Sequence, residues 1–196
     1  MNVYGERLEG YDIHEGTNVG RVLYNVASLP SVLNFLETGT QIGGSARVIG
    51  SALKNTSGEL HTIEAVQSRV DEARTNLYDL PVECHWMSTK NETGLRGYYN
   101  RFVSEIKVAD GEFEDLVQSR QWDAAFLDSC SVSQQYELEC VIELRVKHII
   151  MHEPDAKCPG FAEYMKNQYY TLEEKGFDDI NGHRPMFVYY TTGVSV

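Results

Sequence analysis

The feature that most constrains the fold is an alternation of short apolar runs with amphipathic stretches along the chain. The apolar runs are typical of strands and cover residues 32–37, 59–64, 82–88, 122–128, 146–153 and 186–193. Apolar residues at helical spacing cover 44–55, 65–80, 133–145 and 160–176. Strands that alternate with helices predict an α/β fold with a doubly wound, mostly parallel sheet. The nearly continuous apolar character of the runs indicates that helices cover both faces of that sheet.

The length of the chain predicts one domain. At 196 residues it can bury a substantial core, and no Pro- or Gly-rich stretch marks a linker within it. We therefore expect a single domain over residues 1–196. Residues 1–30 precede the first strand and contain a helix-like stretch that ends ahead of Pro30. We expect this segment to contribute to substrate binding or to contact between copies of the chain in a homo-oligomer.

Composition narrows the classes of partner. The formal net charge is −12, and the basic residues are scattered, so repulsion from phosphate backbones disfavours nucleic acid as a substrate. The chain has no apolar run of about 18 residues that would span a membrane and no signal-like N-terminus. Its four cysteines, Cys84, Cys130, Cys140 and Cys158, form no C-x-x-C pair. We therefore expect a cytoplasmic protein with reduced thiols and no membrane partner.

The segment NFLETGTQIGGSARVIGSAL, residues 34–53, places three glycines between the first strand and a helix. In open parallel sheets, ligands bind beyond the carboxyl ends of the strands. Gly39 and Gly43 lack side chains that would screen the backbone from a ligand, and the Ser45 hydroxyl is placed to cap the helix. A tight turn with glycines chosen for positive φ explains the same pattern without a ligand. The loop alone leaves both interpretations open.

A second acidic residue, Glu64, ends the second strand. A carboxylate at this position suits two vicinal ribose hydroxyls, whereas the alternative is an acid that stabilises the dipole of the next helix. The loop has neither the G-x-G-x-x-G pattern of nicotinamide-cofactor sites nor the G-K-[ST] of a P-loop. Phosphate binding is therefore disfavoured.

The segments FLETGTQIGGSARVIGSAL and GELHTIEAVQSRVDEARTNL resemble the first half of the class I S-adenosylmethionine-dependent methyltransferases. The closest match is to small O-methyltransferase-like members, whose motif reads roughly E-x-G-x-x-x-G-x-S. WDAAFLDS and VKHIIMHEP are similar to the family's fourth and fifth strands, and GFDDINGHRPMFVYYTTG resembles its terminal pair of strands. The resemblance covers about residues 20–194. It implies a Rossmann-like sheet with a C-terminal antiparallel strand, S-adenosylmethionine as cofactor, and methyl transfer to an oxygen of a small-molecule acceptor.

The resemblance also implies three groups of cofactor-binding residues. The residues around the methionine half of the cofactor would be Glu37, Gly39, Thr40, Gln41, Gly43 and Ser45. Around the adenosine, Glu64 would hold the ribose hydroxyls, Ala65 would lie beside the adenine and Ser88 would face the adenine amine. Asp128 and Ser129 would border the sulfonium centre.

Methyl transfer to a hydroxyl requires alignment of the acceptor and removal of its proton. His152, at the carboxyl end of the run 146–153, is the candidate general base, with Asp128 as the second catalytic residue. The alternative for His152 is a histidine that is hydrogen-bonded within the edge of the sheet. Asp128, His152, Glu153 and Asp155 together offer a hard-cation set for Mg²⁺. The sequence leaves the use of a metal undecided.

Departures from the family pattern keep an alternative function open. Residues 143–145 read Glu-Leu-Arg where glycines are usual before the fifth strand, and Ser129-Cys130 follows Asp128 where look-alikes often have Gly and then His. The alternative function is cleavage of S-adenosylmethionine, or loss of methyl transfer with a role as a binding module. Residues 89–112, polar and aromatic, suit either a substrate lid or a helix packed on the core. Three histidines inside strands, His61, His85 and His148, are expected to be packing residues.

Overall fold

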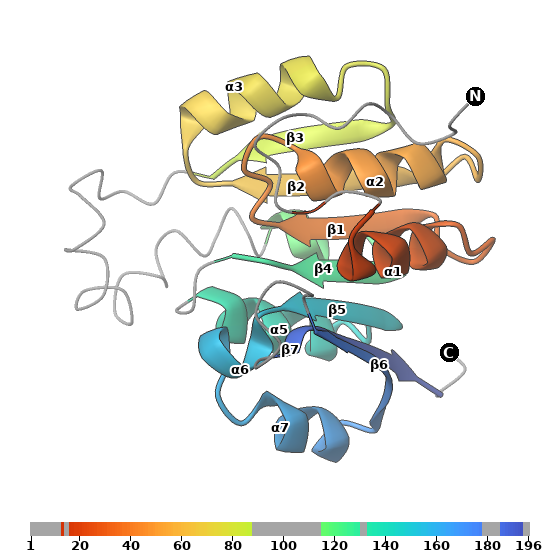
Figure 1. The fold of residues 1–196 in the computed structure, drawn as a ribbon, viewed down its shortest axis with the longest axis vertical. Coiled ribbons are helices and arrows are strands. Elements are labelled where there is room, and N and C mark those ends of the chain that lie inside the picture. Colours follow the sequence, from red (N-terminus) through yellow and green to blue (C-terminus); the bar gives the residue numbers. More distant parts are fainter. Residues whose placement is uncertain (1–12, 14–15, 88–114, 130–132, 178–184, 194–196) are drawn as a thin grey trace.

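In the computed structural model, which describes residues 13, 16–87, 115–129, 133–177 and 185–193, a seven-stranded sheet lies between two layers of helices (Figure 1). The strands are β1 (Asn34–Thr38), β2 (Glu59–Glu64), β3 (Val82–Trp86), β4 (Ala124–Leu127), β5 (His148–His152), β6 (Tyr170–Phe177) and β7 (Pro185–Thr192). The main helices are α1 (Asn18–Ala27), α2 (Gly44–Leu53), α3 (Gln67–Asn76), α5 (Ser133–Glu143), α6 (Pro154–Lys157) and α7 (Phe161–Asn167).

The strand order is β3-β2-β1-β4-β5-β7-β6. The first five strands of that order are paired in parallel, and β7 pairs antiparallel with both β5 and β6. This confirms the predicted doubly wound, mostly parallel Rossmann-like sheet with a C-terminal antiparallel strand. The order reverses between β1 and β4, so the chain leaves these two neighbouring strands in opposite directions, which is where such sheets bind their ligands.

Two hydrophobic clusters, one on each face, hold the sheet. Helices α1, α2 and α3 cover one face, where Leu23, Ile49 and Val70 pack on Phe35 and Phe126. Helices α5 and α7 cover the other face, where their apolar side chains pack on residues of β4 and β5. Because both faces are covered, the central strands are buried along most of their length, which accounts for their continuous apolar sequences.

The predicted helix over 160–176 is wrong in its second half. Helix α7 ends at Asn167, Tyr169 takes a left-handed backbone with φ of 65°, and β6 begins at Tyr170. The helix-forming residues of this stretch lie on an edge strand, where pairing with β7 overrides their intrinsic preference. Gly176 is therefore no helix cap. A Cβ there would collide with the Phe187 ring of β7.

The predicted helix before Pro30 is present as α1. Thr17 caps it by accepting a hydrogen bond from the Gly20 N–H at 3.0 Å, and its apolar face packs into the core. Part of the segment 1–30 is therefore core, whereas residues 1–12 lie outside the described residues. Three cysteines, Cys84, Cys140 and Cys158, are free thiols. In the part of the chain that the structure describes, no helix has both the length and the apolar character needed to cross a membrane.

Candidate active site

The loop from β1 to α2 is shaped by contacts within the protein. Gly39 has φ of 86°, and a Cβ there would lie 2.5 Å from the backbone oxygen of Asp128 at the end of β4. Gly43 has φ of 100°, and its Cβ would lie 3.0 Å from Leu77 Cδ1. The missing side chain of Gly39 therefore lets the ends of β1 and β4 meet at the point where the strand order reverses, and that of Gly43 leaves room for Leu77. Gly39 and Gly43 have a packing role that needs no ligand.

The predicted cap of α2 is also different. Helix α2 begins at Gly44 with Gly43 as its N-cap, and no side chain caps it. The Ser45 side chain instead lies beside the Glu37 carboxyl group and lowers its pKa by hydrogen bonding. Ser45 is thus part of the polar network below the loop, with the Glu37 carboxyl group as its hydrogen-bond partner.

Glu37 is a fully buried carboxyl group at the centre of that network. Thr62 Oγ1 donates to Glu37 Oε2, and Thr40 and Thr62 share a hydrogen bond between their hydroxyls. Glu37 Oε1 has no hydrogen-bond partner among the described residues. Desolvation by burial raises the pKa of Glu37 to about 7, although the hydrogen bonds of Ser45 and Thr62 act to lower it. One oxygen of this acid is therefore available for a donor that the described residues do not supply.

Glu64 joins the two loops that leave β1 and β2. Its Oε2 accepts the Gln41 N–H at 2.8 Å and its Oε1 accepts the Val66 N–H at 2.9 Å. The residue is only 6% exposed, yet Ala65 and Val66 beside it are exposed. Each carboxylate oxygen can accept a second hydrogen bond. Glu64 is therefore both a structural tie and an acceptor placed at the edge of the sheet.

Next to Glu64, the end of β3 presents an exposed aromatic surface. Trp86 is 43% exposed, and its indole N–H donates to the Ala65 oxygen at 3.2 Å. Val66 is also 43% exposed. A flat ring such as adenine would find two apolar side chains here. They lie beside Ala65, the residue that the resemblance predicts next to the adenine.

Asp128, His152 and Lys157 meet where β4 and β5 end. Asp128 Oδ1 lies 2.8 Å from His152 Nδ1 and 2.6 Å from Lys157 Nζ. When a carboxylate accepts a hydrogen bond from Nδ1–H, the ring proton stays on Nδ1 and Nε2 keeps its lone pair. This is the form of the imidazole that a general base needs. The structure thus brings the two predicted catalytic residues together. It also places Lys157 in this cluster. Lys157 reaches Asp128 from the short helix α6, and no sequence pattern indicated that contact.

The position of His152 is fixed from behind by α5. Gln134 Nε2 donates to the backbone oxygens of Leu127 at 2.7 Å and His152 at 3.1 Å, and so joins the ends of β4 and β5. Glu137 Oε2 accepts from Thr38 Oγ1 at 2.7 Å and from Ser129 Oγ at 2.6 Å. Ser129 is therefore held near Asp128 by a buried acid, whose pKa is raised by desolvation.

The residues of the predicted Mg²⁺ set do not converge. Lys157 Nζ, which lies 2.6 Å from Asp128 Oδ1 and 3.4 Å from Glu153 Oε2, is a cation already between these two carboxylates. Asp155 is exposed on α6. These residues do not fit a hard divalent ion, because an ammonium group holds the position that it would take. Two further predicted features, Ser88 and the segment 89–112, lie outside the described residues, as does Cys130.

Among the described residues, carboxyl groups predominate along this edge. The carboxyl groups of Glu37, Glu64 and Asp128 come from the ends of three neighbouring strands, β1, β2 and β4. Lys157 is paired with Asp128. Such an edge repels phosphates and attracts a ligand that carries positive charge and hydroxyl donors.

Comparison with solved structures bears on the fold of the chain. No protein-family model matches the chain. No curated protein matches it. A putative O-methyltransferase from Klebsiella pneumoniae superposes with a TM-score of 0.68 at 19% identity, over 95% of this chain and 84% of that one. The O-methyltransferase from Bacillus cereus, crystallised with SAH, gives 0.66 at 16% identity, over 94% of this chain and 84% of that one. The O-methyltransferase TomG from Streptomyces achromogenes, crystallised with SAM, gives a TM-score of 0.62 at 18% identity, over 89% of this chain and 80% of that one.

The chain has the fold of a class I S-adenosylmethionine-dependent methyltransferase. Arg145 illustrates one departure within that fold. It takes a left-handed backbone with φ of 57° in the turn before β5, where the sequence led us to expect glycines in the family. In this chain a non-glycine residue therefore takes the left-handed conformation in that turn.

Proposed function

We propose that the protein is an S-adenosylmethionine-dependent methyltransferase that methylates an oxygen of a small-molecule acceptor. The observation that carries the proposal is the row of functional groups at the carboxyl ends of β1, β2, β4 and β5. It places the Glu64 carboxylate at one end and the Asp128–His152–Lys157 cluster at the other.

The chemistry of the ligand matches this edge better than that of a nucleotide. S-adenosylmethionine carries a sulfonium, an ammonium and two ribose hydroxyls, and it has no phosphate. Glu37 Oε1, which has no partner among the described residues, is a buried acceptor for a donor such as the ammonium group. The Glu64 carboxylate is an acceptor for the ribose hydroxyls, and Val66 and Trp86 offer apolar surface for the adenine. Solved neighbours that were crystallised with SAM or SAH support the same choice of cofactor.

His152 would act as the base. The cofactor, when bound, supplies an electrophilic methyl group. His152 Nε2 accepts the proton of an acceptor hydroxyl while Asp128, which receives the Nδ1–H, keeps the ring in the required orientation. Lys157 donates to the Asp128 carboxylate and holds it in place. Gln134 holds the backbone of His152 against the end of β4.

Several finer points belong to the same proposal. The acceptor is a small molecule because a net charge of −12 opposes nucleic acid. Oxygen is favoured because solved neighbours are named as O-methyltransferases. The location remains cytoplasmic in the proposal, on the cysteine pattern alone. Burial raises the pKa of Cys84 and of Cys158 to about 11, which suits unreactive thiols. The alternative of cofactor cleavage or loss of transfer is not favoured by the methyltransferase neighbours.

The decisive experiment measures products. The purified protein is incubated with methyl-labelled S-adenosylmethionine and a panel of phenols, catechols, carboxylates and amines, and the products are separated by mass. Transfer yields S-adenosylhomocysteine and a methylated acceptor in equal amounts. Methylthioadenosine or homoserine lactone in place of these would show cleavage. Binding of S-adenosylhomocysteine with no product from any acceptor would support a binding module.

A further inference from the structure

Two histidines that the sequence pattern gave as packing residues face each other across β2 and β3. His61 Nδ1 lies 2.9 Å from His85 Nε2, and the two rings are nearly parallel with an interplanar angle of 14°. The Glu83 carboxylate is close to both nitrogens, 3.6 Å from His61 Nδ1 and 3.9 Å from His85 Nε2. Among the described residues this is the one group of three His, Cys, Asp or Glu side chains whose ligand atoms lie within 4.8 Å of one another.

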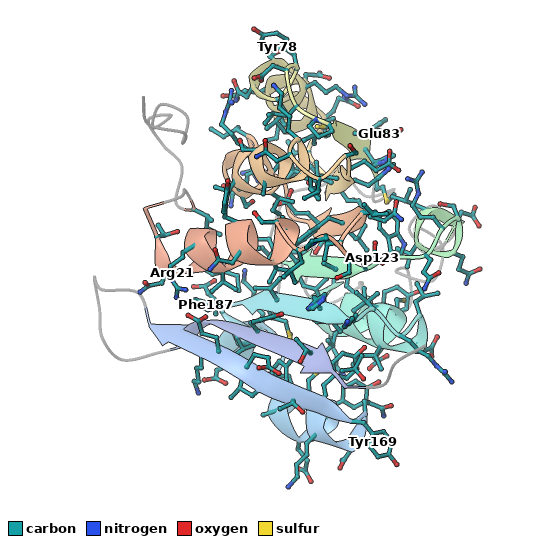
Figure 2. The ribbon with its side chains drawn as sticks, turned by 90° about the vertical axis from the view of Figure 1, so that its right-hand side faces the viewer. Arg21, Tyr78, Glu83, Asp123, Tyr169 and Phe187 are labelled. Atoms are coloured by element: carbon teal, nitrogen blue, oxygen red, sulfur yellow. The ribbon has the colours of Figure 1, made fainter. Side chains whose placement is uncertain are left out.

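The cluster is separate from the cofactor site. Side chains alternate along a strand, so His61 lies on the opposite face of β2 from Thr62 and Glu64. His61 makes an edge contact with Trp122, which belongs to the cluster on the α5 side of the sheet. Glu83 lies on β3, the outermost strand on this side (Figure 2). A ligand here would therefore not compete with S-adenosylmethionine.

We propose that His61 Nδ1, His85 Nε2 and the Glu83 carboxylate bind a divalent transition-metal ion. Two nitrogens that each lie about 2.0–2.1 Å from one ion at a right angle are about 2.9 Å apart, and at a tetrahedral angle about 3.3 Å. The observed separation of 2.9 Å therefore matches coordination of one ion by both nitrogens, once the rings turn so that both lone pairs point at it. Glu83 is 65% exposed, so its side chain can rotate onto the ion. Two imidazoles and one carboxylate favour Zn²⁺, Ni²⁺ or Cu²⁺ over Mg²⁺ or Ca²⁺.

Metal binding through His61 Nδ1 requires Arg120 to turn away from His61 Nε2. Without metal, His61 Nε2 accepts from Arg120 at 2.6 Å, which leaves the ring proton on Nδ1 to donate to His85. Coordination through Nδ1 requires the proton on Nε2 instead. Glu59 Oε1, 3.3 Å from His61 Nε2 and already paired with Arg120, can accept that proton's hydrogen bond. A carboxylate behind a ligand histidine is the usual support of such sites.

The exposure of the three side chains shows the side from which an ion would enter. His61 is 1% exposed and His85 is 21% exposed, so an ion would enter from the side of His85 and Glu83. Because β3 is an edge strand, the ion would clip it to β2.

The test is metal binding by the full chain after removal of any histidine tag. In calorimetry we expect one equivalent of Zn²⁺ or Ni²⁺ to bind, and 1 mM Mg²⁺ to leave that binding unchanged. Zn²⁺ should also raise Tm of the wild type, because the ion binds only the folded cluster. His85→Gln and Glu83→Gln should weaken Zn²⁺ binding by about tenfold or more and remove the rise in Tm. Glu72→Gln, which changes an exposed carboxylate on α3, is the matched control and should bind as the wild type does.

A second measurement identifies the ligands directly. Electron paramagnetic resonance of the Cu²⁺ form should show two coordinating imidazole nitrogens in the wild type and one in His85→Gln. Circular dichroism checks that each variant is folded, and Glu83→Gln carries the test if His85→Gln is not. Zn²⁺ binding that is equal in the wild type and in both variants would overturn the proposal. Absence of one-equivalent binding in the wild type would overturn it as well.

Discussion

Lys157 Nζ lies 2.6 Å from Asp128 Oδ1, the same oxygen that accepts the hydrogen bond of the candidate base His152. The ammonium group lies between the Asp128 and Glu153 carboxylates, where a cation held by these two groups would lie. We therefore expect methyl transfer by the wild type to change less than about twofold in EDTA or with added Mg²⁺. The control is the stability of the protein in EDTA, measured by thermal unfolding. Activity lost in EDTA and restored by Mg²⁺ would contradict this assignment.

Replacement of Lys157 should lower activity without a large change in cofactor affinity. In Lys157→Met, the Asp128 carboxylate keeps only His152 as a partner and is less firmly fixed. We expect kcat to fall by about tenfold or more, since a general base contributes about 10²–10⁴ and its orientation is part of that. Lys157→Arg, which keeps the charge, should recover part of the loss. The measurement is kcat with the best acceptor, beside the Kd of S-adenosylhomocysteine.

His152→Gln should remove most of the turnover if His152 is the base. A decrease of kcat by about 10²-fold or more is expected, with the Kd of S-adenosylhomocysteine within about threefold of the wild type. Asp128→Asn is the informative partner variant, because it keeps the shape of the side chain and changes how the imidazole is held. Wild-type turnover in His152→Gln would show that the histidine is only hydrogen-bonded at the edge of the sheet.

Glu64 should be needed for recognition of the ribose. S-adenosylhomocysteine and its 2′-deoxy analogue are compared by calorimetry in the wild type and in Glu64→Gln. Hydrogen bonds to a charged group contribute about 1.5–3 kcal/mol, so the wild type should bind the analogue at least about tenfold more weakly. In Glu64→Gln the two ligands should bind with similar affinity. Because Glu64 also ties two loops, the difference between ligands, and not the affinity alone, tests the ribose contact.

The positions of the strands were predictable, whereas several contacts of the site were not. Residues 59–64 form β2 as expected because a continuous apolar run is what a strand buried on both faces requires. Glu64 is the last residue of this strand, as the sequence predicted for the same reason. The stretch 170–177 was not predictable as a strand, because its helix-forming residues lie on an edge that only the pairing with β7 defines.

Contacts between distant elements account for the other misses. Lys157 reaches Asp128 only because α6 follows the end of β5 in a turn that begins with a left-handed Glu153, at φ of 49°. Nothing in the local pattern indicates that geometry. The pair His61 and His85 depends on the register of β2 and β3, in which His61 lies opposite Glu83. Period-two alternation places each histidine on a face, but it does not give the register.

Glu37 should make the stability of the protein depend on pH. Burial raises its pKa from 4.5 to about 7 in the folded protein, so the folded state favours the protonated acid. The stabilising contribution is complete below pH 4.5 and is lost as the pH rises through about 7. Glu37→Gln removes the ionisation. We therefore expect the free energy of unfolding of Glu37→Gln, relative to that of the wild type, to rise by on the order of 3 kcal/mol between pH 5 and pH 8. Urea unfolding of both proteins at each pH measures this difference. A difference that is constant with pH would show that Glu37 does not titrate in this window.

Gly39→Ala should destabilise the protein more than Gly160→Ala. Both glycines have positive φ, 86° and 81°, so both substitutions carry the cost of a left-handed backbone, about 1–2 kcal/mol. A Cβ at Gly39 would also lie 2.5 Å from the Asp128 backbone oxygen, whereas a Cβ at Gly160 would meet nothing within 4 Å. The difference between the two variants in urea unfolding therefore isolates the collision between the ends of β1 and β4, which we expect to cost at least about 1 kcal/mol more. Equal free energies of unfolding would mean that the two strand ends can separate, and that the loop is free to adapt at the point where the cofactor is proposed to bind.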